Sequence, residues 1–166
     1  MKQTLKRYVI TILANNRPRL ITKICGLFDR KGFNLESISA GRVRGKDMVR
    51  MSICVNSVRR SGQQLKKYLY KFPEVMNVSE AKIDSDIIRE LILIKLKSCK
   101  SQSKMIQLLR IFNAKFIDGN SNHYIIELCN ECNNIDKFIN AFNKDCILEI
   151  TGSGIVAIKR LKKRRS

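Results

Sequence analysis

The chain has 166 residues and a mass of 19.2 kDa, and its 33 Lys and Arg against 14 Asp and Glu give a formal net charge of +19. Its 44% of hydrophobic residues can bury one core or two small ones, which excludes a disordered basic tail. No apolar run reaches the roughly 18 residues that a bilayer-spanning helix needs. The first residues also lack the apolar stretch of a signal peptide, so we expect a cytoplasmic protein.

The charge is concentrated in two parts of the chain. Residues 1–83 carry 18 basic and 5 acidic side chains, residues 84–158 carry 9 of each, and the last eight residues add six more cations. The six cysteines lie mostly in apolar runs such as 52–55, where a thiol behaves as a small hydrophobic side chain. We therefore expect thiols rather than a disulfide framework.

The first half reads as a strand, a loop and a helix. Alternation over residues 8–13 predicts a strand, and the polar segment 14–19 contains Pro18, which suits the first turn of a helix. A helical stripe then follows and stops at Gly32, with the apolar residues Leu20, Ile24, Leu27 and Phe28. The sequence thus predicts that a loop with a free helix start follows the first strand.

The pattern continues with two more strands, at 33–40 and 48–55, around a basic hairpin loop at 41–46. A second helix opens at Ser61 and is stopped by Pro73, and a fourth strand spans 75–81. The order βαββαβ is that of a ferredoxin-like sandwich. It repeats about eighty residues later, with elements at 91–96, 105–112, 115–118, 124–128, 135–142 and 146–150.

We therefore predict an α+β protein with two ferredoxin-like domains in tandem, at residues 8–83 and 84–160, followed by a basic tail at 161–166. Each domain is near the size at which a lone core is marginal, which favours mutual packing or oligomerisation.

A catalytic site is not indicated. His123 is the single histidine, and no nearby Ser or Cys forms a nucleophile pair with it. The pair Cys129 and Cys132 lacks the further ligands of a zinc site, and it follows a strand where a redox pair would open a helix. The segment 151–154 lacks the Lys of a phosphate-binding loop.

Two binding surfaces remain. The turn from Asn15 to Arg19 has free backbone N–H groups that suit a carboxylate, and we expect the amide of Asn34, at the start of the second strand, to lie near it. Alternatively, Asn15 serves helix entry and Asn34 a turn. The second surface is basic and could be a solvated face or meet an acidic partner, with Arg42, Arg44, Lys46, Arg50, Arg59 and Arg60.

Several segments resemble the small, regulatory subunit of acetolactate synthase (acetohydroxyacid synthase). The first half resembles its ACT domain, through residues 15–20, 24–38 and 50–53. The second half is similar to the rest of that family in order and spacing, at 89–95, 111–118 and 153–157. The resemblance covers nearly the whole chain up to about residue 160, and a generic ACT domain would share only the first loop.

The resemblance implies a non-catalytic chain that binds and activates a catalytic subunit and confers feedback inhibition by valine or related branched-chain amino acids. It also implies a homodimer through ACT domains, with the effector held by Asn15, Pro18, Arg19, Leu20, Asn34 and Leu35. Thiamine diphosphate, Mg²⁺ and FAD would belong to the catalytic subunit, and this chain would hold no cofactor or metal.

One position departs from the family pattern. Pro18 stands where the family has a glycine, and proline has no N–H to offer a carboxylate and fixes φ near −65°. We therefore predict that effector binding is weakened or lost while activation persists. The basic tail is also unlike the usual end of the family.

Two other functions remain as alternatives. The charge would suit a nucleic-acid-binding ferredoxin-like module, but residues 48–55 of the third strand carry no aromatic side chain to stack bases. A free-standing amino-acid-responsive regulator would need a further DNA-binding or enzyme domain, for which no residues are left.

Overall fold

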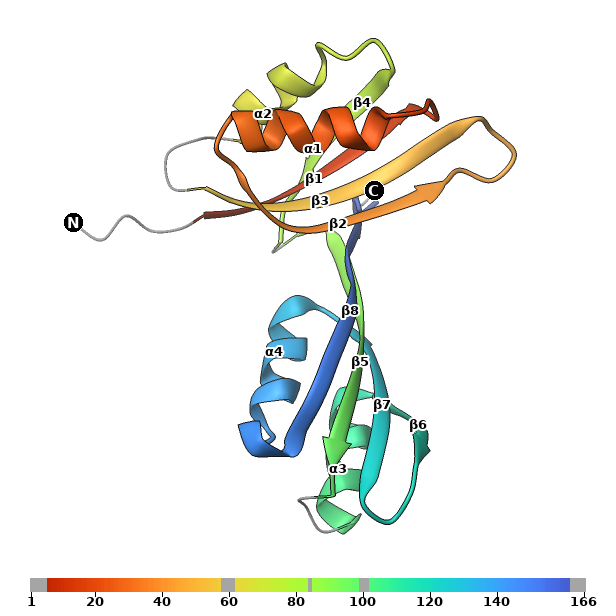
Figure 1. The fold of residues 1–166 in the computed structure, drawn as a ribbon, viewed down its shortest axis with the longest axis vertical. Coiled ribbons are helices and arrows are strands. Elements are labelled where there is room, and N and C mark those ends of the chain that lie inside the picture. The colour runs from red at the N-terminus through yellow and green to blue at the C-terminus, as the bar shows by residue number, and fades with distance from the viewer. Residues whose placement is uncertain (1–5, 58–61, 84, 99–101, 162–166) are drawn as a thin grey trace, which may run out of the picture. The chain divides into compact units, whose positions relative to one another are not determined.

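The computed structural model describes residues 6–57, 62–83, 85–98 and 102–161, and the chain divides into two compact units (Figure 1). The first unit combines residues 1–88 with 155–166, and the second consists of residues 89–154. The second predicted domain, 84–160, extends beyond the second unit at both ends. Residues 162–166 of the predicted basic tail lie outside the described residues.

The first unit has the predicted order βαββαβ and forms one antiparallel sheet with strand order β2-β3-β1-β4. Its elements are β1 (Lys6–Asn15), α1 (Leu20–Arg30), β2 (Asn34–Arg42), β3 (Met48–Ser57), α2 (Gly62–Leu69) and β4 (Val75–Ala81). The predicted helix start Ser61 lies outside the described residues, and α2 ends at Leu69, before Pro73. This strand order is that of a ferredoxin-like sandwich, as predicted.

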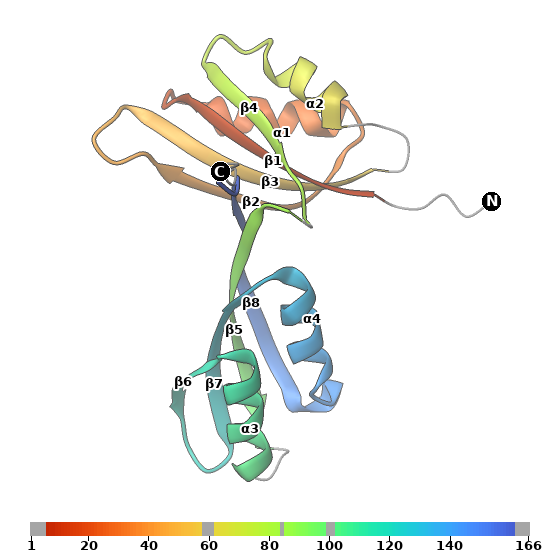
Figure 2. The ribbon, with the colours of Figure 1, turned by 180° about the vertical axis from the view of Figure 1, so that it is seen from behind.

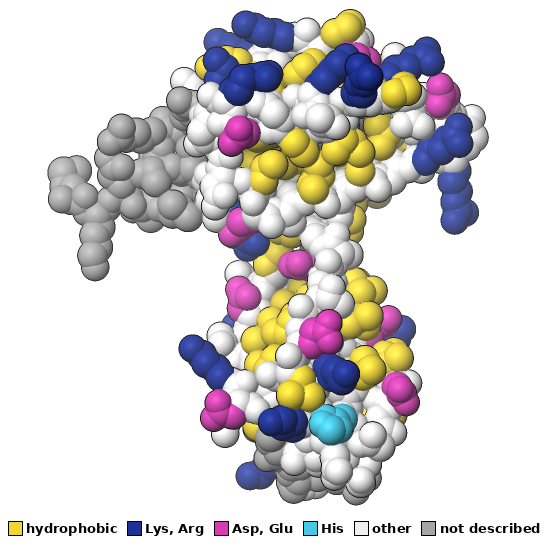
Figure 3. Space-filling model, in the orientation of Figure 1, with side chains coloured by type: hydrophobic (Ala, Val, Ile, Leu, Met, Phe, Trp, Pro, Cys, Tyr) yellow, Lys and Arg dark blue, Asp and Glu magenta, His cyan; other side chains and the backbone are white. Residues whose placement is uncertain are grey.

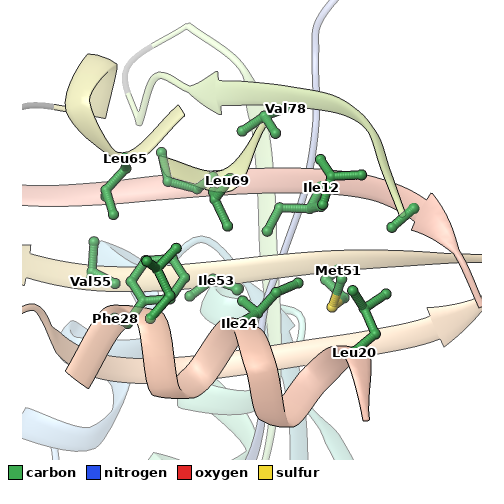
Figure 4. Packing of buried hydrophobic residues seen from close by; sticks show 14 of the residues in the cluster. Ile12, Leu20, Ile24, Phe28, Met51, Ile53, Val55, Leu65, Leu69 and Val78 are labelled. Atoms are coloured by element: carbon green, nitrogen blue, oxygen red, sulfur yellow. The ribbon is translucent and has the colours of Figure 1, made fainter. Parts of the chain in front are cut away.

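The core of the first unit lies between one face of this sheet and the helices (Figure 4). Because strand side chains alternate between faces, every second residue of β1 and β3 points toward α1 and α2. Full burial of each such side chain stabilises the fold by about 1.5–3 kcal/mol. Its large and almost fully buried members include Ile10, Ile12, Leu20, Ile24, Phe28, Met51, Ile53, Val55, Leu65 and Leu69.

The second unit repeats this arrangement with strand order β6-β7-β5-β8. Its elements are β5 (Ile87–Lys97), α3 (Gln102–Phe112), β6 (Lys115–Gly119), β7 (His123–Asn130), α4 (Cys132–Asn140), a short 3₁₀ turn (Lys144–Cys146) and β8 (Ile147–Ile158). Figure 2 shows α3 and α4 on the same side of the sheet, where a second hydrophobic core contains Ile94, Leu96, Ile126 and Phe138. The prediction of two ferredoxin-like domains is therefore confirmed.

Several predicted boundaries in the second half are wrong: β5 begins at Ile87 rather than 91 and α3 at Gln102 rather than 105, and β8 and α4 also differ. β8 runs to Ile158, eight residues past the predicted end, because the small polar residues 151–154 interrupt the hydrophobic pattern without ending the strand. α4 begins at Cys132, three residues before the predicted start. Cys132 therefore does open a helix, contrary to the expectation that the Cys129–Cys132 pair has no helix start.

The end of β8 lies on the face of the first sheet that is turned away from α1 and α2. The N–H of Ile155 donates to the Ser37 hydroxyl and that of Ala157 to the Ser52 hydroxyl, each at 3.3 Å. The N–H of Arg160 donates to the Asp86 carboxylate at 3.1 Å. The first unit is therefore completed by residues from the other end of the chain.

The described cysteines are of two kinds, and Cys99 lies outside the described residues. Cys25, Cys54, Cys129 and Cys132 are free thiols, whereas Cys146 is disulfide-bonded, so the expectation of thiols does not hold at that residue. Among the described helices, none is both long and apolar enough to cross a membrane.

Candidate functional site

The loop between β1 and α1 is a tight turn that leads directly into the helix. The N–H of Leu20 donates to the carbonyl oxygen of Arg17 at 3.3 Å, with Pro18 and Arg19 at the two central positions. Arg19 has φ 65° and ψ 3°, the values of the third residue of a type II turn. Proline suits the second position of that turn, whereas the left-handed third position favours glycine.

The start of α1 keeps donor groups available for a ligand. The first bond into the helix runs from the N–H of Lys23 to the carbonyl oxygen of Arg19 at 2.9 Å. No described residue accepts a hydrogen bond from the N–H of Ile21 or Thr22, and the first turn contains no acidic side chain. These N–H groups and the positive end of the helix dipole can hold a carboxylate.

Backbone bonds fix this loop to both neighbouring segments. The N–H of Asn15 donates to the carbonyl oxygen of Glu74 at 2.8 Å, and the N–H of Asn16 donates to the carbonyl oxygen of Asp47 at 3.1 Å. Lys23 forms an ion pair of 2.7 Å with Glu74, and its hydrogen bond is the main cause that lowers the pKa of Glu74. These bonds connect the start of the loop to the segment before β4 and to the basic hairpin.

Four of the predicted effector-binding residues gather here, and two do not. Asn15, Pro18, Arg19 and Leu20 lie at this loop, although Leu20 is buried in the core and exposes only 2% of its surface. Asn34 and Leu35 begin β2, beside Asn56 and Val55 of β3.

The expectation that Asn34 lies near the loop of the same chain is wrong. Asn15 pairs with Met48 and Asn34 pairs with Asn56, and these partners are eight residues apart along β3. At about 3.3 Å per residue they are about 26 Å apart. One chain therefore holds the two halves of the predicted site at opposite ends of its sheet.

The basic hairpin joins β2 to β3. A turn closes it, with the N–H of Lys46 donating to Val43 at 3.2 Å and Gly45 at φ 71°. Asp47 is paired with Arg42 at 3.6 Å and with Arg17 at 3.8 Å. Of the predicted basic surface, Arg59 and Arg60 lie outside the described residues.

A polar cluster on the open face of the first sheet, partly exposed to solvent, was not predicted. Glu36 accepts hydrogen bonds from Arg7 Nε at 2.6 Å, Asn56 Nδ2 at 2.7 Å and the Cys54 thiol at 3.0 Å. Burial raises the pKa of Glu36, but these hydrogen bonds and the Arg7 charge outweigh it, so the pKa lies below its ordinary value. Burial, and then the bond to Glu36, raise the pKa of Cys54 to about 12.

No comparable cluster suggests chemistry elsewhere in the described part of the chain. His123 begins β7 as predicted and lines a hollow of about 600 Å³ with Lys95 and Asp118. Within the described residues, no group of three or more His, Cys, Asp or Glu is arranged to hold a metal ion.

A ferredoxin-like sandwich with an open helix start after its first strand is the architecture of an ACT-type ligand-binding domain. Residues 10–77 match the family model described as the AHAS small subunit-like ACT domain. Residues 89–161 match the model described as the small subunit of acetolactate synthase. The chain belongs to the family of acetolactate synthase small subunits, a regulatory ACT-domain family, and the predicted resemblance is confirmed.

Known relatives match over both units. The chain is 30% identical over 157 residues to the acetolactate synthase small subunit of Mycobacterium leprae, covering 94% of this chain and 93% of the relative. It is 31% identical over 159 residues to a probable acetolactate synthase small subunit of Archaeoglobus fulgidus, covering 95% and 99%. The crystal structure of the Thermotoga maritima acetolactate synthase small subunit superposes with a TM-score of 0.85 at 30% identity, covering 95% and 99%.

Proposed function

We propose that this chain is a non-catalytic regulatory subunit that binds and activates an acetolactate synthase catalytic subunit in branched-chain amino-acid biosynthesis. The observation that carries the proposal is a match to small subunits over 94–95% of this chain and 93–99% of the two relatives. A shared ACT domain alone would account only for the first unit. Thiamine diphosphate, Mg²⁺ and FAD would then reside on the catalytic subunit.

The proposed subunit acts as a homodimer through β2. This strand is at the edge of the first sheet, so its outer row of N–H and C=O groups has no strand partner among the described residues. Exposed apolar side chains border it, with Ile38 on β2 and Ile21 on α1 exposed by 37% and 44%. Figure 3 shows hydrophobic side chains gathered between α1 and β2.

Antiparallel pairing of two β2 strands about a two-fold axis would also complete the effector site. The end of β2 lies level with the β1–α1 loop, because Arg42 pairs with Val49 and Asn15 with the adjacent Met48. Such pairing brings the start of one β2 to the end of the other. Asn34 of one copy would then lie near the loop of the partner copy.

The effector that suits these groups is a branched-chain amino acid such as valine. The free N–H groups at the start of α1 would bind its carboxylate, and the Asn15 and Asn34 amides its polar groups. Leu35, which is half-buried beside the core, would contact the apolar side chain. Because Pro18 removes one N–H and one flexible position, we propose that effector binding is weakened.

Co-expression with a cognate catalytic subunit tests the function. We expect the two chains to elute together, with acetolactate formation several times faster than that of the catalytic subunit alone. Separate elution with no gain in activity would contradict the proposal. Nucleic acid retained by the isolated chain at moderate salt would instead favour a nucleic-acid-binding module, which the net charge of +19 would suit.

A further inference from the structure

The hairpin between β2 and β3 carries an excess of positive charge that the fold does not neutralise. Residues 41–50 contain four cationic side chains and one acidic one. Asp47 is occupied by Arg42 and Arg17. No described carboxylate lies within ion-pair distance of Arg44, Lys46 or Arg50. Figure 3 shows Lys and Arg side chains projecting at this end of the first unit.

A groove of about 450 Å³ adjoins the hairpin on the open face of the first sheet. Cationic and apolar side chains line it together, with Arg42 and Arg50 beside Val43, Val156 and Ala157. Arg42 and Val43 also line a second hollow of about 480 Å³ within the hairpin, so these two residues border both hollows. Gly41 belongs to the groove, and a methyl group on its Cα would meet no atom within 4 Å.

These features define what would bind. Cations without partners favour carboxylates, and Val43, Val156 and Ala157 favour an apolar side chain between them. Single-stranded nucleic acid would require aromatic side chains on which bases stack, and no described aromatic residue lines the groove or the hairpin hollow. The combination therefore suits a protein segment.

We propose that the hairpin and this groove form a docking surface for a segment of the catalytic subunit that carries carboxylates beside an apolar side chain. This inference rests on the proposed function and names the surface that performs it. Because the cations are exposed, they would mainly accelerate association and set its salt dependence, whereas the groove would slow dissociation.

Two variants change the charge of the surface and the volume of the groove, and Arg50 belongs to both features. The triple variant Arg44→Glu, Lys46→Glu and Arg50→Glu reverses three cations without breaking an ion pair among the described residues. Gly41→Val fills the groove without changing the charge. A matched control in the second unit reverses three exposed cations, Lys104, Arg110 and Lys137, to Glu. Far-UV circular dichroism verifies that each variant is folded.

The measurement is binding of each variant to the purified cognate catalytic subunit at 50 and 500 mM salt. We expect the triple variant to bind about tenfold or more weakly at 50 mM, with a smaller difference at 500 mM. Gly41→Val should bind several-fold more weakly at both salts, and the control should bind like the wild type. These results together would support the proposal.

Other results would overturn it. If the wild type binds and neither the triple variant nor Gly41→Val binds more weakly, the proposed docking surface is wrong, whereas the proposed function still holds. If the control variant binds as weakly as the triple variant, the loss of binding is a nonspecific effect of charge reversal. A triple variant that loses binding to RNA while keeping the catalytic subunit would assign the cations to nucleic acid. Absence of wild-type binding would remove both the surface and the proposed function.

Discussion

The backbone N–H of Asn16 donates a 3.1 Å hydrogen bond to the carbonyl oxygen of Asp47. Asn16 belongs to the candidate effector loop, and Asp47 closes the basic hairpin, where its carboxylate also faces Arg17 and Arg42. The loop and the hairpin are therefore joined through one residue. A displacement of the loop on ligand binding would act directly on the proposed docking surface.

The left-handed Arg19 gives a stability prediction. Arg19→Gly should leave the free energy of unfolding unchanged or raise it by up to about 1 kcal/mol, because glycine avoids the Cβ penalty of φ 65° but gains entropy when unfolded. Arg19→Val should lower it by about 1 kcal/mol or more. Urea denaturation measures both. The control Arg30→Val, in the last turn of α1, should change it by only about 0.5 kcal/mol, and an equal loss at both positions would contradict the turn geometry.

Pro18 gives a prediction on regulation. In the reconstituted complex, Pro18→Gly should be inhibited at lower valine concentrations than the wild type, because glycine supplies an N–H and relaxes the turn. Valine titration of acetolactate formation measures the change. Pro73→Gly, before β4, is the matched control and should behave like the wild type. Equal sensitivity of wild type and Pro18→Gly would show that proline does not weaken the site.

Ile38 gives a prediction on assembly. Ile38→Lys places a charge at the edge of β2 and should shift the chain from dimer to monomer. Sedimentation velocity measures the change. Ile106→Lys changes an exposed isoleucine of α3 and should leave the dimer intact. A dimer that persists in Ile38→Lys would place the interface elsewhere.

Glu36 gives a prediction on pH. Its folded-state pKa lies below the ordinary 4.5, so the ionised group contributes stability above that value and loses it as the pH falls through the folded pKa. Glu36→Gln should cost about 1 kcal/mol at pH 7, since the group is partly exposed, and flatten the loss of stability in acid. Denaturation at pH 7 and pH 3 measures both. The control Glu149→Gln, at an exposed position of β8, should change neither the stability at pH 7 nor its loss in acid. If wild type and Glu36→Gln lose stability in parallel as the pH falls, the prediction is wrong.

Cys54 gives a prediction on reactivity. Its side chain is buried and its pKa is raised to about 12, so little thiolate is present at pH 8. In the folded protein, iodoacetamide should modify the exposed Cys129 long before Cys54. Mass spectrometry of peptides measures the two rates, and both thiols should react once the chain is unfolded in urea. Similar rates in the folded protein would contradict the burial of Cys54.

Apolar residues that alternate in strands or recur at helical spacing predict most of this fold, because these residues form the two hydrophobic cores. The stripe of Leu20, Ile24 and Phe28 is the core face of α1, and alternating Met51, Ile53 and Val55 are the core face of β3. The position of the end of β8 cannot be predicted in this way, because its backbone N–H groups donate hydrogen bonds to the hydroxyls of Ser37 and Ser52, more than 100 residues away in the sequence.

Only part of the candidate site can be predicted from the sequence. The sequence assigns Pro18 to the first turn of the helix, but the helix begins at Leu20 and Pro18 lies in the turn before it. The separation of Asn15 from Asn34 depends on β3 lying between β1 and β2, which only the strand order reveals. The Glu36 cluster combines three strands and has no local signature.

The position of Ile155 also bears on how the chain folds during synthesis. Residues 89–154 are an insertion between the two parts of the first unit, so the ribosome makes the whole second unit before the last piece of the first. Until then Ser37, which pairs with Cys54 in the sheet, lacks the N–H of Ile155. The nascent ACT domain therefore cannot form its contacts with residues 155–160 until the second unit has been synthesised. If translation stalls before these residues are made, the face of the first sheet that they contact would be accessible to chaperones.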